Sequence, residues 1–525
     1  MDFFVLKKER MEKMKEKKYL VLGITLVVLT FVGVSLAYFL TTIEGDRKNI
    51  TINTSDLRVI FTNGDAIEGT EIEPGWSVTK TFSVENKTKN EYKYNIVIED
   101  LVNTFKTTGY LQYKIISTDG GYNMTDFEDV PKSLNSTNIG LAFNITIPSK
   151  STQNYTITIQ YRNDENVDQS IDSLLDAVVT GKLYISEGSN PTLTYAMLRD
   201  NPTINERTDF SVANTSNTTG TIYQTNKTED GSTVYYYSGN TTNNWVHFGG
   251  FYWRIIRTNE DGSVRLLYSG TSHDTREGYI GTSAYNSTYN DPMYVGYMYG
   301  TSGLLENNRL NTDDSTIKVA VDTWYENNLL ADYNKYISKT AIYCNDRSIS
   351  SDYTYSTSSR FNYGTYTRLA TNKAPTYKCG GNTSDGLFES VQAIADKFSA
   401  STEGGENGQL KYPIALMTAD EIVFAGGKAG TSLSSPYAWY YTNSQGESIT
   451  GTHYWWSLSP YDWFGSSARV WGVDGSGIPG DLSGSGVRSN DGVRPSLALS
   501  SCVGIKSGIG TPESPYEIDY EGSCK

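Results

Sequence analysis

The sequence predicts a mainly β protein with an α+β C-terminal part, organised as an N-terminal membrane helix, an antiparallel β-sandwich and a second, mixed domain. Three observations predict this organisation. An uncharged apolar run follows a basic N-terminus, apolar and polar residues alternate through much of residues 41–187, and helical patterns stand between strand patterns after residue 240. With 525 residues, of which 38% are hydrophobic, the chain is long enough for two or three domains.

The N-terminus predicts export. Basic residues from Lys7 to Lys18 mark residues 1–18 as a cytoplasmic segment, because positively charged flanks are retained inside the cell. Residues 19–40 carry no charge and are long enough to cross a bilayer as a helix. The small residues that end at Ala37 also suit a cleavage site, so a transmembrane anchor and a cleaved signal both fit. In either case we expect the rest of the chain, with its C-terminus, at the cell surface, membrane-anchored or secreted.

Residues 41–187 predict the sandwich. Val78, Phe82 and Val84 alternate with polar residues, and Tyr155 to Tyr161 repeats the pattern. We find no catalytic constellation in this region. Residues 188–240 lose the alternation and are rich in Gly, Asn and Thr, so we interpret them as a linker that carries one short helix near Leu193.

Residues 241–502 predict the mixed α+β domain. Strands Phe251–Arg257 and Ser263–Tyr268 flank a short hairpin loop. Apolar spacing predicts helices over Ser315–Leu330 and Gly386–Phe398. A third helix begins with a capping box, Thr418 with Glu421, and ends at Gly426. Residues 503–525 form a C-terminal tail with a disulfide.

Four cysteines in an exported chain predict disulfides, because the exterior is oxidising. Three pairings are available. Pairing of nearest neighbours, Cys344 with Cys379 and Cys502 with Cys524, closes the shortest loops. A zinc site is disfavoured because the sequence has no C-x-x-C spacing and no nearby histidine.

The stretch from His453 to Leu499 has rigid flanks and a polar middle. Either Trp455 or Trp456 is expected in the core, and the other packs under a loop or offers a stacking surface to a sugar. The closing strand contains Pro495, which indicates an edge position or a bulge. Arg494 is expected to be a structural pin, and Trp471 a core residue.

The polar middle of this stretch has an unusual composition. Between Glu447 and Lys506 there is no Lys, Glu, Gln or Met, and the positions that look free belong to the set reached by randomising the first two bases of an Asn codon. Tyr, Ser, Gly, Asp and Asn are also the residues of adaptable recognition loops. We therefore predict a variable ligand-binding loop face. Its expected residues are Tyr461, Asp462, Trp463, Phe464, Ser466, Ser467, Gly472, Asp474, Ser476, Ile478, Asp481, Ser483, Ser485, Arg488, Asn490 and Asp491.

Two resemblances add to this interpretation. The export segment ending in "LAYFL" and the sandwich motif "EPGWSVTKTFSVEN" resemble the TasA/camelysin-like exported proteins of Gram-positive bacteria, some of which form matrix fibres. "FGGFYWRIIR", "LMTADEIVFAGG", "YWWSLSP" and "GVRPSL" resemble a domain of surface proteins of Gram-positive gut bacteria. The closing layout of that domain is similar to the C-type lectin fold of formylglycine-generating enzymes and of retroelement-diversified variable proteins. A family that is simply rich in Gly and Ser here fits equally well.

The leading functional hypothesis is an exported cell-surface ligand-binding protein, adhesin-like or receptor-like, whose partner is an extracellular protein or glycan. The alternative is a structural subunit of an extracellular matrix fibre, with self-association through the sandwich. An enzyme of the formylglycine-generating type is disfavoured, because those relatives need a cysteine pair in the cleft and no cysteine lies within the loop region. We interpret the three histidines, His247, His273 and His453, as structural.

Charge and spacing exclude several other classes. The net charge of −15 leaves no basic face for a phosphate backbone, so nucleic acid is not an expected partner. Asp474, Asp481 and Asp491 are close in sequence, but flexible Gly and Ser separate them and the lectin-type calcium motif is absent. We expect no metal and no cofactor.

Overall fold

A computed structural model describes most of the chain after residue 40. The described residues are 41–44, 50–54, 57–63, 67–69, 72–105, 109–130, 133–170, 172, 177–379, 390–392, 396–401, 408–429, 438–475 and 480–524. They divide into two compact units, one ending at Ser189 and the other starting at Asn190. Within these ranges no helix has the length and apolar character needed to span a bilayer. The predicted segments 1–18 and 19–40 lie outside the described residues.

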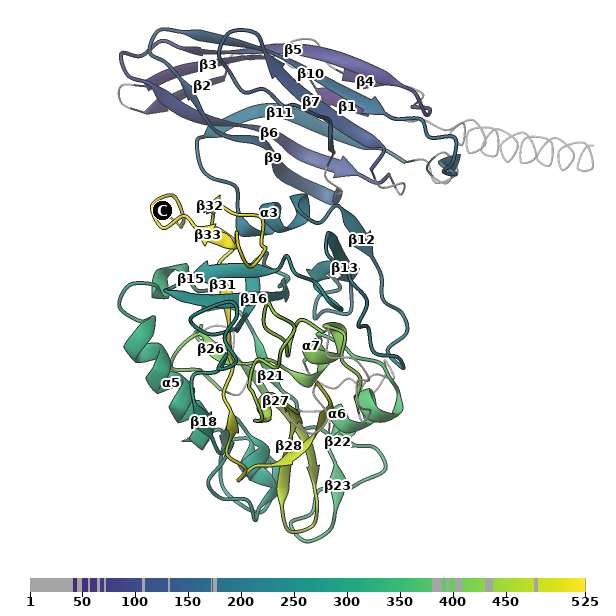
Figure 1. Ribbon diagram of the computed structural model, residues 1–525, viewed down its shortest axis with the longest axis vertical. Helices are drawn as coiled ribbons and strands as arrows, with labels where there is room; N and C mark the ends of the chain where they lie inside the picture. The colour runs from purple at the N-terminus through teal and green to yellow at the C-terminus, as the bar shows by residue number, and fades with distance from the viewer. Residues whose placement is uncertain are drawn as a thin grey trace, which may run out of the picture. The chain divides into compact units, whose positions relative to one another are not determined.

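The first unit is a β-sandwich, as the alternation predicts (Figure 1). One sheet has the order β4 (Ile67–Gly69), β1 (Thr41–Glu44), β11 (Val179–Glu187), β6 (Tyr92–Asn103), β9 (Ser133–Ile147). The other has the order β2 (Ile50–Thr54), β3 (Leu57–Asn63), β5 (Ser77–Asn86), β10 (Thr152–Tyr161), β7 (Leu111–Ser117), β8 (Glu128–Asp129). All pairs are antiparallel except β1 with β11, which is parallel and departs from the purely antiparallel expectation.

The core of the sandwich comes from the residues that alternate in the sequence. Phe82 and Val84 of β5 and Tyr155 to Tyr161 of β10 point their alternate side chains into one buried cluster with residues of the other sheet. This arrangement is expected for strands in which apolar and polar residues alternate, because the apolar face of each sheet is buried away from water.

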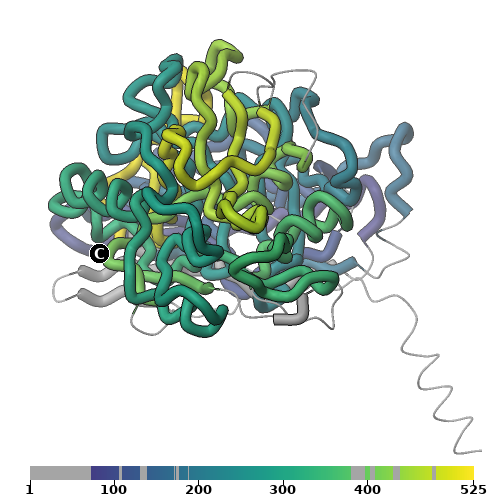
Figure 2. The backbone as a smooth tube through the Cα atoms, turned by 90° about the horizontal axis from the view of Figure 1, so that it is seen from below, coloured from purple at the N-terminus to yellow at the C-terminus, as the bar shows by residue number. Residues whose placement is uncertain are grey.

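The second unit is built on a large, mostly antiparallel sheet. Its path is β12 (Thr203–Asn205), β13 (Thr221–Thr225), β14 (Val234–Tyr236), β16 (Phe251–Thr258), β15 (Trp245–Phe248), β33 (Tyr516–Ile518), β32 (Ile505–Ser507). From β16 a branch continues through β17 (Val264–Tyr268) and β31 (Pro495–Leu499) to β26 (Ile414–Leu416). C-terminal strands, yellow in Figure 2, therefore run beside teal and green segments from the middle of the chain.

A second sheet of this unit carries the Trp-rich stretch. Its order is β18 (Thr282–Ser283), β30 (Asp491–Gly492), β27 (Trp455–Trp463), β28 (Ala468–Val473), β29 (Leu482–Gly486), with β23 (Phe361–Asn362) beside β27. Three two-stranded pairs complete the strands: β19 (Met298–Tyr299) with β20 (Asp313–Asp314), β21 (Tyr343–Asn345) with β25 (Asp396–Phe398), and β22 (Ile349–Ser350) with β24 (Ser390–Gln392).

Short helices fill the connections of the second unit. The α-helices are α3 (Leu193–Arg199), α4 (Leu305–Asn308), α5 (Thr316–Asn328), α6 (Gly364–Tyr366) and α7 (Ala419–Phe424). Two 3₁₀ turns, η1 (Pro292–Val295) and η2 (Asn334–Tyr336), and one π turn, η3 (Thr367–Thr371), accompany them. α5 confirms the helix predicted over Ser315–Leu330, and α7 has the predicted capping box with Gly426 at φ +123° after its end.

The predicted linker and tail are corrected by the structure. Residues 190–240 contain α3 and strands β12 to β14, and Leu193, Ile222 and Tyr236 belong to the core of the second unit. Residues 503–525 contribute β32 and β33 to its main sheet. Polar composition misled the prediction, because these strands are too short for a visible alternation and join the main sheet only through β14 with β16 and β33 with β15.

Two further predictions are wrong in detail. A helix was expected over Gly386–Phe398, but the described part of that range forms strands β24 and β25, which pair with β22 and β21. The edge position expected for Pro495 is also wrong, since β31 lies between β17 and β26. Pro495 is tolerated there because it is the first residue of the strand.

Candidate functional site

The predicted loop face is part of a sheet. β27, β28 and β29 occupy most of the range from Trp455 to Gly486, which the sequence indicated as a polar loop region between rigid flanks. Glycine has a packing reason here: a Cβ at Gly484 would lie 2.5 Å from the ring of Tyr461. The small residues therefore let an aromatic ring lie against a neighbouring strand, which composition alone does not reveal.

The structure separates the sixteen predicted ligand-binding residues by exposure. Phe464, Ser466, Arg488 and Asn490 are exposed. Tyr461, Ser467, Asp481, Ser483 and Ser485 are partly exposed. Asp462, Trp463, Gly472, Asp474 and Asp491 are buried, so their expected place on a ligand face is a correction. Ser476 and Ile478 lie outside the described residues.

A compact polar and aromatic cluster lies at the turn between β27 and β28 and includes Arg360, the residue before β23. We call it the hairpin tip: Arg360, Asp462, Phe464 and Arg469. Asp462 is fully buried and accepts hydrogen bonds from Arg469 Nε at 2.6 Å and from Arg360 Nη2 at 3.4 Å. Both guanidinium groups also lie over the ring of Phe464, each 4.8 Å from its centroid. The ring is held by its neighbours while its own side chain is 53% exposed.

The tip carries one net positive charge, because two arginines share one aspartate. Burial opposes the charge of Arg469, but the hydrogen bond to Asp462 and the negative charge of Asp462 together outweigh it and raise the pKa of the guanidinium. The rest of the chain has a large negative charge, −15 overall. The hairpin tip is therefore a small cationic and aromatic projection on an acidic protein.

Two other predicted residues make contacts next to the same sheet. Arg488 lies 3.9 Å from the centroid of the Tyr289 ring. Asn490 Nδ2 donates to Thr282 Oγ1 at 2.9 Å. These contacts hold exposed side chains without burying them, which leaves them able to contact a partner.

The tryptophans of this region are core residues. Trp455 and Trp456 are both fully buried, and Trp456 Nε1 donates to the Ser283 carbonyl at 2.8 Å. Neither ring offers a stacking surface for a sugar, so the packing alternative holds. Trp471 is also buried, with the Tyr461 ring at 4.5 Å, as expected for a core residue.

Arg494 is the structural pin that the sequence indicates. It is fully buried, and its guanidinium donates to the carbonyls of Tyr268 at 3.1 Å and Gly278 at 3.2 Å and to that of Tyr440. Burial lowers its pKa to about 9. It joins three segments rather than facing solvent.

The histidines and carboxylates show no metal arrangement among the described residues. His247 Nδ1 lies 3.1 Å from Glu517 Oε1, and His273 Nδ1 lies 2.8 Å from Ser444 Oγ.

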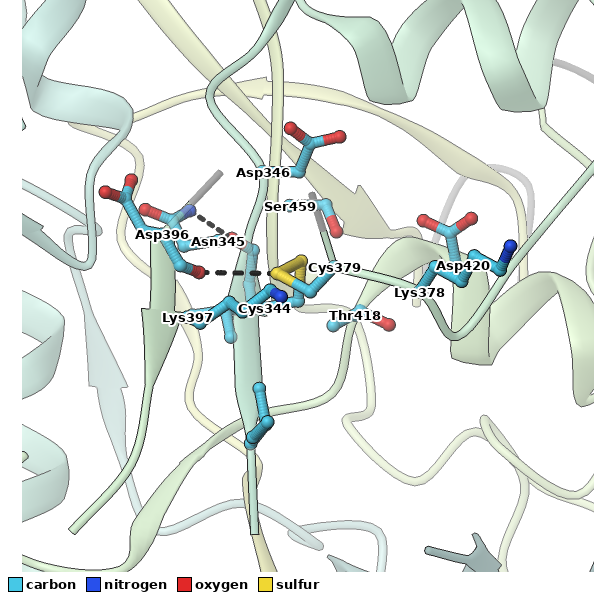
Figure 3. The surroundings of a disulfide bond; sticks show 12 residues. Cys344, Asn345, Asp346, Lys378, Cys379, Asp396, Lys397, Thr418, Asp420 and Ser459 are labelled. Carbon is cyan, nitrogen blue, oxygen red and sulfur yellow. Dashed lines mark hydrogen bonds between the residues drawn. A yellow bond between two sulfur atoms is a disulfide. The ribbon is translucent and has the colours of Figure 1, made fainter. Parts of the chain in front are cut away.

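Both disulfides form as predicted, Cys344 with Cys379 and Cys502 with Cys524. The first lies at a pocket that sequence reasoning missed. Asp346, Thr418, Asp420 and Ser459 lie around the bridge and come from three segments of the chain, with Thr418 and Asp420 both at the start of α7 (Figure 3). None of the pocket's residues belongs to the predicted loop face.

Buried ion pairs form the floor of the pocket. Glu421 Oε1 accepts from Arg257 Nε and from Arg265 Nη1, both at 3.1 Å. Arg368 pairs with Asp346 at 3.0 Å and with Asp420 at 2.8 Å. Burial opposes ionisation of Glu421, but the two arginines together lower its pKa. The capping box marked Glu421 in the sequence, but nothing there indicated its arginine partners, which lie more than 150 residues away.

Comparisons with known proteins assign no family. No family model matches the chain, and no curated protein matches it. A solved structure described as "AvmM Catalyzes Macrocyclization in Alchivemycin A Biosynthesis" is 10% identical, over 28% of this chain and 98% of that chain, with a TM-score of 0.14. A score this low supports no statement about fold or activity.

Proposed function

We propose that this chain is an exported cell-surface protein that binds an extracellular protein or glycan through the hairpin tip of its second unit. The observation that carries the proposal is Phe464, a ring 53% exposed with two guanidinium groups each 4.8 Å from its centroid. Exposed aromatic and arginine side chains dominate the energetics of many interfaces. Their immobilisation lowers the entropy lost on binding.

The chemistry of the tip favours an anionic partner surface. Arg360 and Arg469 together outnumber Asp462 by one charge, and this excess would attract a carboxylate or sulfate of a partner. Two disulfides support an oxidising compartment, which agrees with the export predicted from residues 1–40.

The proposal also refines the expected variability of this face. Diversification would act on exposed positions such as Phe464, Ser466, Arg488 and Asn490. It would spare Asp462, which is buried and pairs with two arginines. If a retroelement does this, the native gene lies beside a reverse transcriptase and a near-copy of its own 3′ end that differs mainly at adenines.

The test is an array of extracellular proteins and glycans probed with the full chain in detergent. Phe464→Ser should remove the signal of the bound partner, and added salt should weaken the wild-type signal. Ile509→Ser is the matched control, because Ile509 is also 53% exposed. Equal losses in both variants would contradict the proposal. Fibres formed by the wild-type chain without any ligand would instead favour the matrix-fibre alternative, with self-association through the sandwich.

A further inference from the structure

The second sheet of the second unit ends at β29. Its strands follow the order β18, β30, β27, β28, β29, so β29 pairs with β28 on one side only. On the other side an isolated bridge joins its first residue, Leu482, to Ala429. The rest of this outer edge, from Ser483 to Gly486, pairs with no further strand in the part of the chain that the structure describes.

The hydrogen bonds at the two ends of β29 show which of its backbone groups face the open side. Two bonds join its flanks to those of β28: Val487 N to the Ala468 carbonyl at 3.1 Å, and Asp474 N to the Asp481 carbonyl at 2.9 Å. Residues 481 and 487 therefore direct their backbone groups toward the β28 side, and so do residues 483 and 485 between them. Gly484 and Gly486 direct theirs toward the open edge.

The outward groups of these two glycines are free and accessible. The Gly486 carbonyl accepts from Ser489 N at 2.8 Å. Within the described ranges, the Gly484 N–H, the Gly484 carbonyl and the Gly486 N–H have no hydrogen-bond partner. Both glycines are partly exposed, and because glycine has no side chain, this exposed surface is backbone. The edge therefore offers hydrogen-bond donors and an acceptor to the solvent.

β29 lacks the features that usually prevent pairing at a sheet edge. Natural edge strands carry Lys or Pro, contain a bulge or are covered by another segment. β32, at one edge of the main sheet, has the exposed Lys506 and a register shift between Ile505 and Ser507. β29 has the sequence LSGSG and pairs with β28 without a register shift. An unprotected edge of ordinary strand length is a template for another extended chain.

The charges at the two ends of β29 indicate the chemistry of the added chain. The exposed Arg488 follows the strand, and the partly exposed Asp481 precedes it. Charge complementarity therefore favours a chain with an acidic side chain beside Arg488. A peptide also matches the outward groups of β29, because the N–H and C=O groups of an extended chain repeat at every second residue. A glycan has no such repeat.

We infer that the outer edge of β29 binds an extended peptide segment of a partner protein as an added strand, with an acidic side chain beside Arg488. Hydrogen bonds to the backbone of Gly484 and Gly486 supply the affinity, as in other complexes in which a peptide extends a sheet. Arg488 sets the direction of the added strand. This surface is separate from the hairpin tip and does not depend on the function proposed for it.

The test selects binders from a phage-displayed library of random linear dodecapeptides on the full chain in detergent. Peptides that bind Gly486→Pro are removed first, because Pro deletes the outward N–H and leaves the hydrogen bonds to β28 in place. Gly486→Ala is the matched control, since it keeps the N–H and its Cβ would meet no atom within 4 Å. A selected peptide should bind Gly486→Ala within about 2-fold of wild type and Gly486→Pro about 10-fold more weakly.

A second measurement needs no variant of the protein. Single backbone nitrogens of the selected peptide are methylated, position by position, and binding to the wild-type chain is measured. Affinity should fall about 10-fold at alternate positions and about 2-fold or less at the positions between them, because only every second N–H of an added strand faces β29. Replacement of the acidic residue of the peptide by its amide should also weaken binding.

The inference is overturned if no peptide survives the removal step, or if methylation shows no period of two. Phe464→Ser should leave peptide binding intact, and loss of binding in that variant would place the peptide at the hairpin tip and overturn the site at β29. A dimer of the wild-type chain that Gly486→Pro abolishes would assign the edge to a second copy of this chain and overturn the inferred partner.

Discussion

The two units bury different kinds of side chain. Among described residues, the charged side chains buried in the sandwich are Lys80 and Asp172, whereas the second unit buries many, including Arg254, Arg265, Arg347 and Arg494, which are among its largest fully buried residues. The sandwich is held by apolar faces that alternate along each strand. The second unit is also held by ion pairs between distant segments, so its core depends on charge.

Glu421→Gln tests this dependence most strongly. Glu421 is 1% exposed and neutralises Arg257 and Arg265, so its loss leaves buried positive charge without compensation. We expect the free energy of unfolding of the second unit to fall by about 3–5 kcal/mol at pH 7. Calorimetry should show the transition of the second unit moving down and that of the sandwich unchanged.

The pH dependence of this variant has a definite sign. The pKa of Glu421 is lowered on folding, so its contribution is complete above the unfolded value, about 4.3, and is lost as pH falls through the folded value. The difference between wild type and Glu421→Gln should therefore narrow below about pH 4. Glu326→Gln is the control, because Glu326 forms an exposed pair with Lys411 and should cost less than about 1 kcal/mol. Similar losses in both variants would show that the second unit does not depend on its buried pairs.

Removal of the Cys344–Cys379 bridge by a double substitution to Ser should destabilise the second unit and not the first, since the first unit contains no cysteine. The bridge spans 35 residues, and its loss should cost about 4 kcal/mol through the entropy of the unfolded chain. Urea denaturation should show a lower midpoint for the second unit alone. The Cys502–Cys524 bridge spans 22 residues and should cost about 0.4 kcal/mol less. A shift in the sandwich transition would contradict the separation of the units.

The contrast between the units also explains what the sequence could predict. The alternation of apolar and polar residues located β5 and β10 and their core residues. A strand with one buried face and one solvent-exposed face has apolar residues at every second position, and this period is visible in the sequence. The capping box located α7, and a helical stripe located α5. Strands β12 to β14, β32 and β33 leave no such record. They have three to five residues each, which is too short for a period to be visible, and they join the main sheet only through β14 with β16 and β33 with β15.

The candidate sites, like the fold, could be predicted from the sequence only in part. Composition identified Phe464, Ser466, Arg488 and Asn490 as free residues, and they are exposed. It also selected Asp462, because a buried aspartate and an exposed one look alike until the positions of Arg360 and Arg469 are known. The pocket was missed altogether, since its lining residues meet only in three dimensions.

Asp462→Asn tests whether Asp462 is a buried or a surface aspartate, and its expected loss of stability is smaller than those above. The buried carboxylate accepts from both arginines, so its replacement should cost about 2 kcal/mol, the value of a hydrogen bond to a charged group. Urea denaturation of the second unit measures it. Arg360→Met should cost less than about 1 kcal/mol, because the Arg360 side chain is half exposed. A cost within about 0.5 kcal/mol for Asp462→Asn would restore the interpretation of Asp462 as a surface residue.

The smallest effect on stability is expected at Asp491, where the substitution should stabilise the protein and not destabilise it. Burial raises the pKa of this carboxyl, so its ionised form opposes folding at neutral pH. Asp491→Asn should raise Tm by no more than about 2 °C at pH 7. The folded state holds its proton more tightly, so the advantage should vanish once pH falls below the unfolded value of about 3.9. A lower Tm at pH 7 would show that the contact from Ser485 Oγ, 3.0 Å away, requires the charge.

The two ends of the second unit lie close together. Leu193 N donates to the Val503 carbonyl at 2.9 Å, Ile505 N donates to the Pro191 carbonyl at 2.8 Å, and the Cys502–Cys524 bridge closes the segment beside them. Tension applied through residue 190 and the Cys502–Cys524 bridge would load these two hydrogen bonds first. Because its ends lie close together, the unit is suited to insertion into a surface loop of another protein and to circular permutation, with little distortion of its fold.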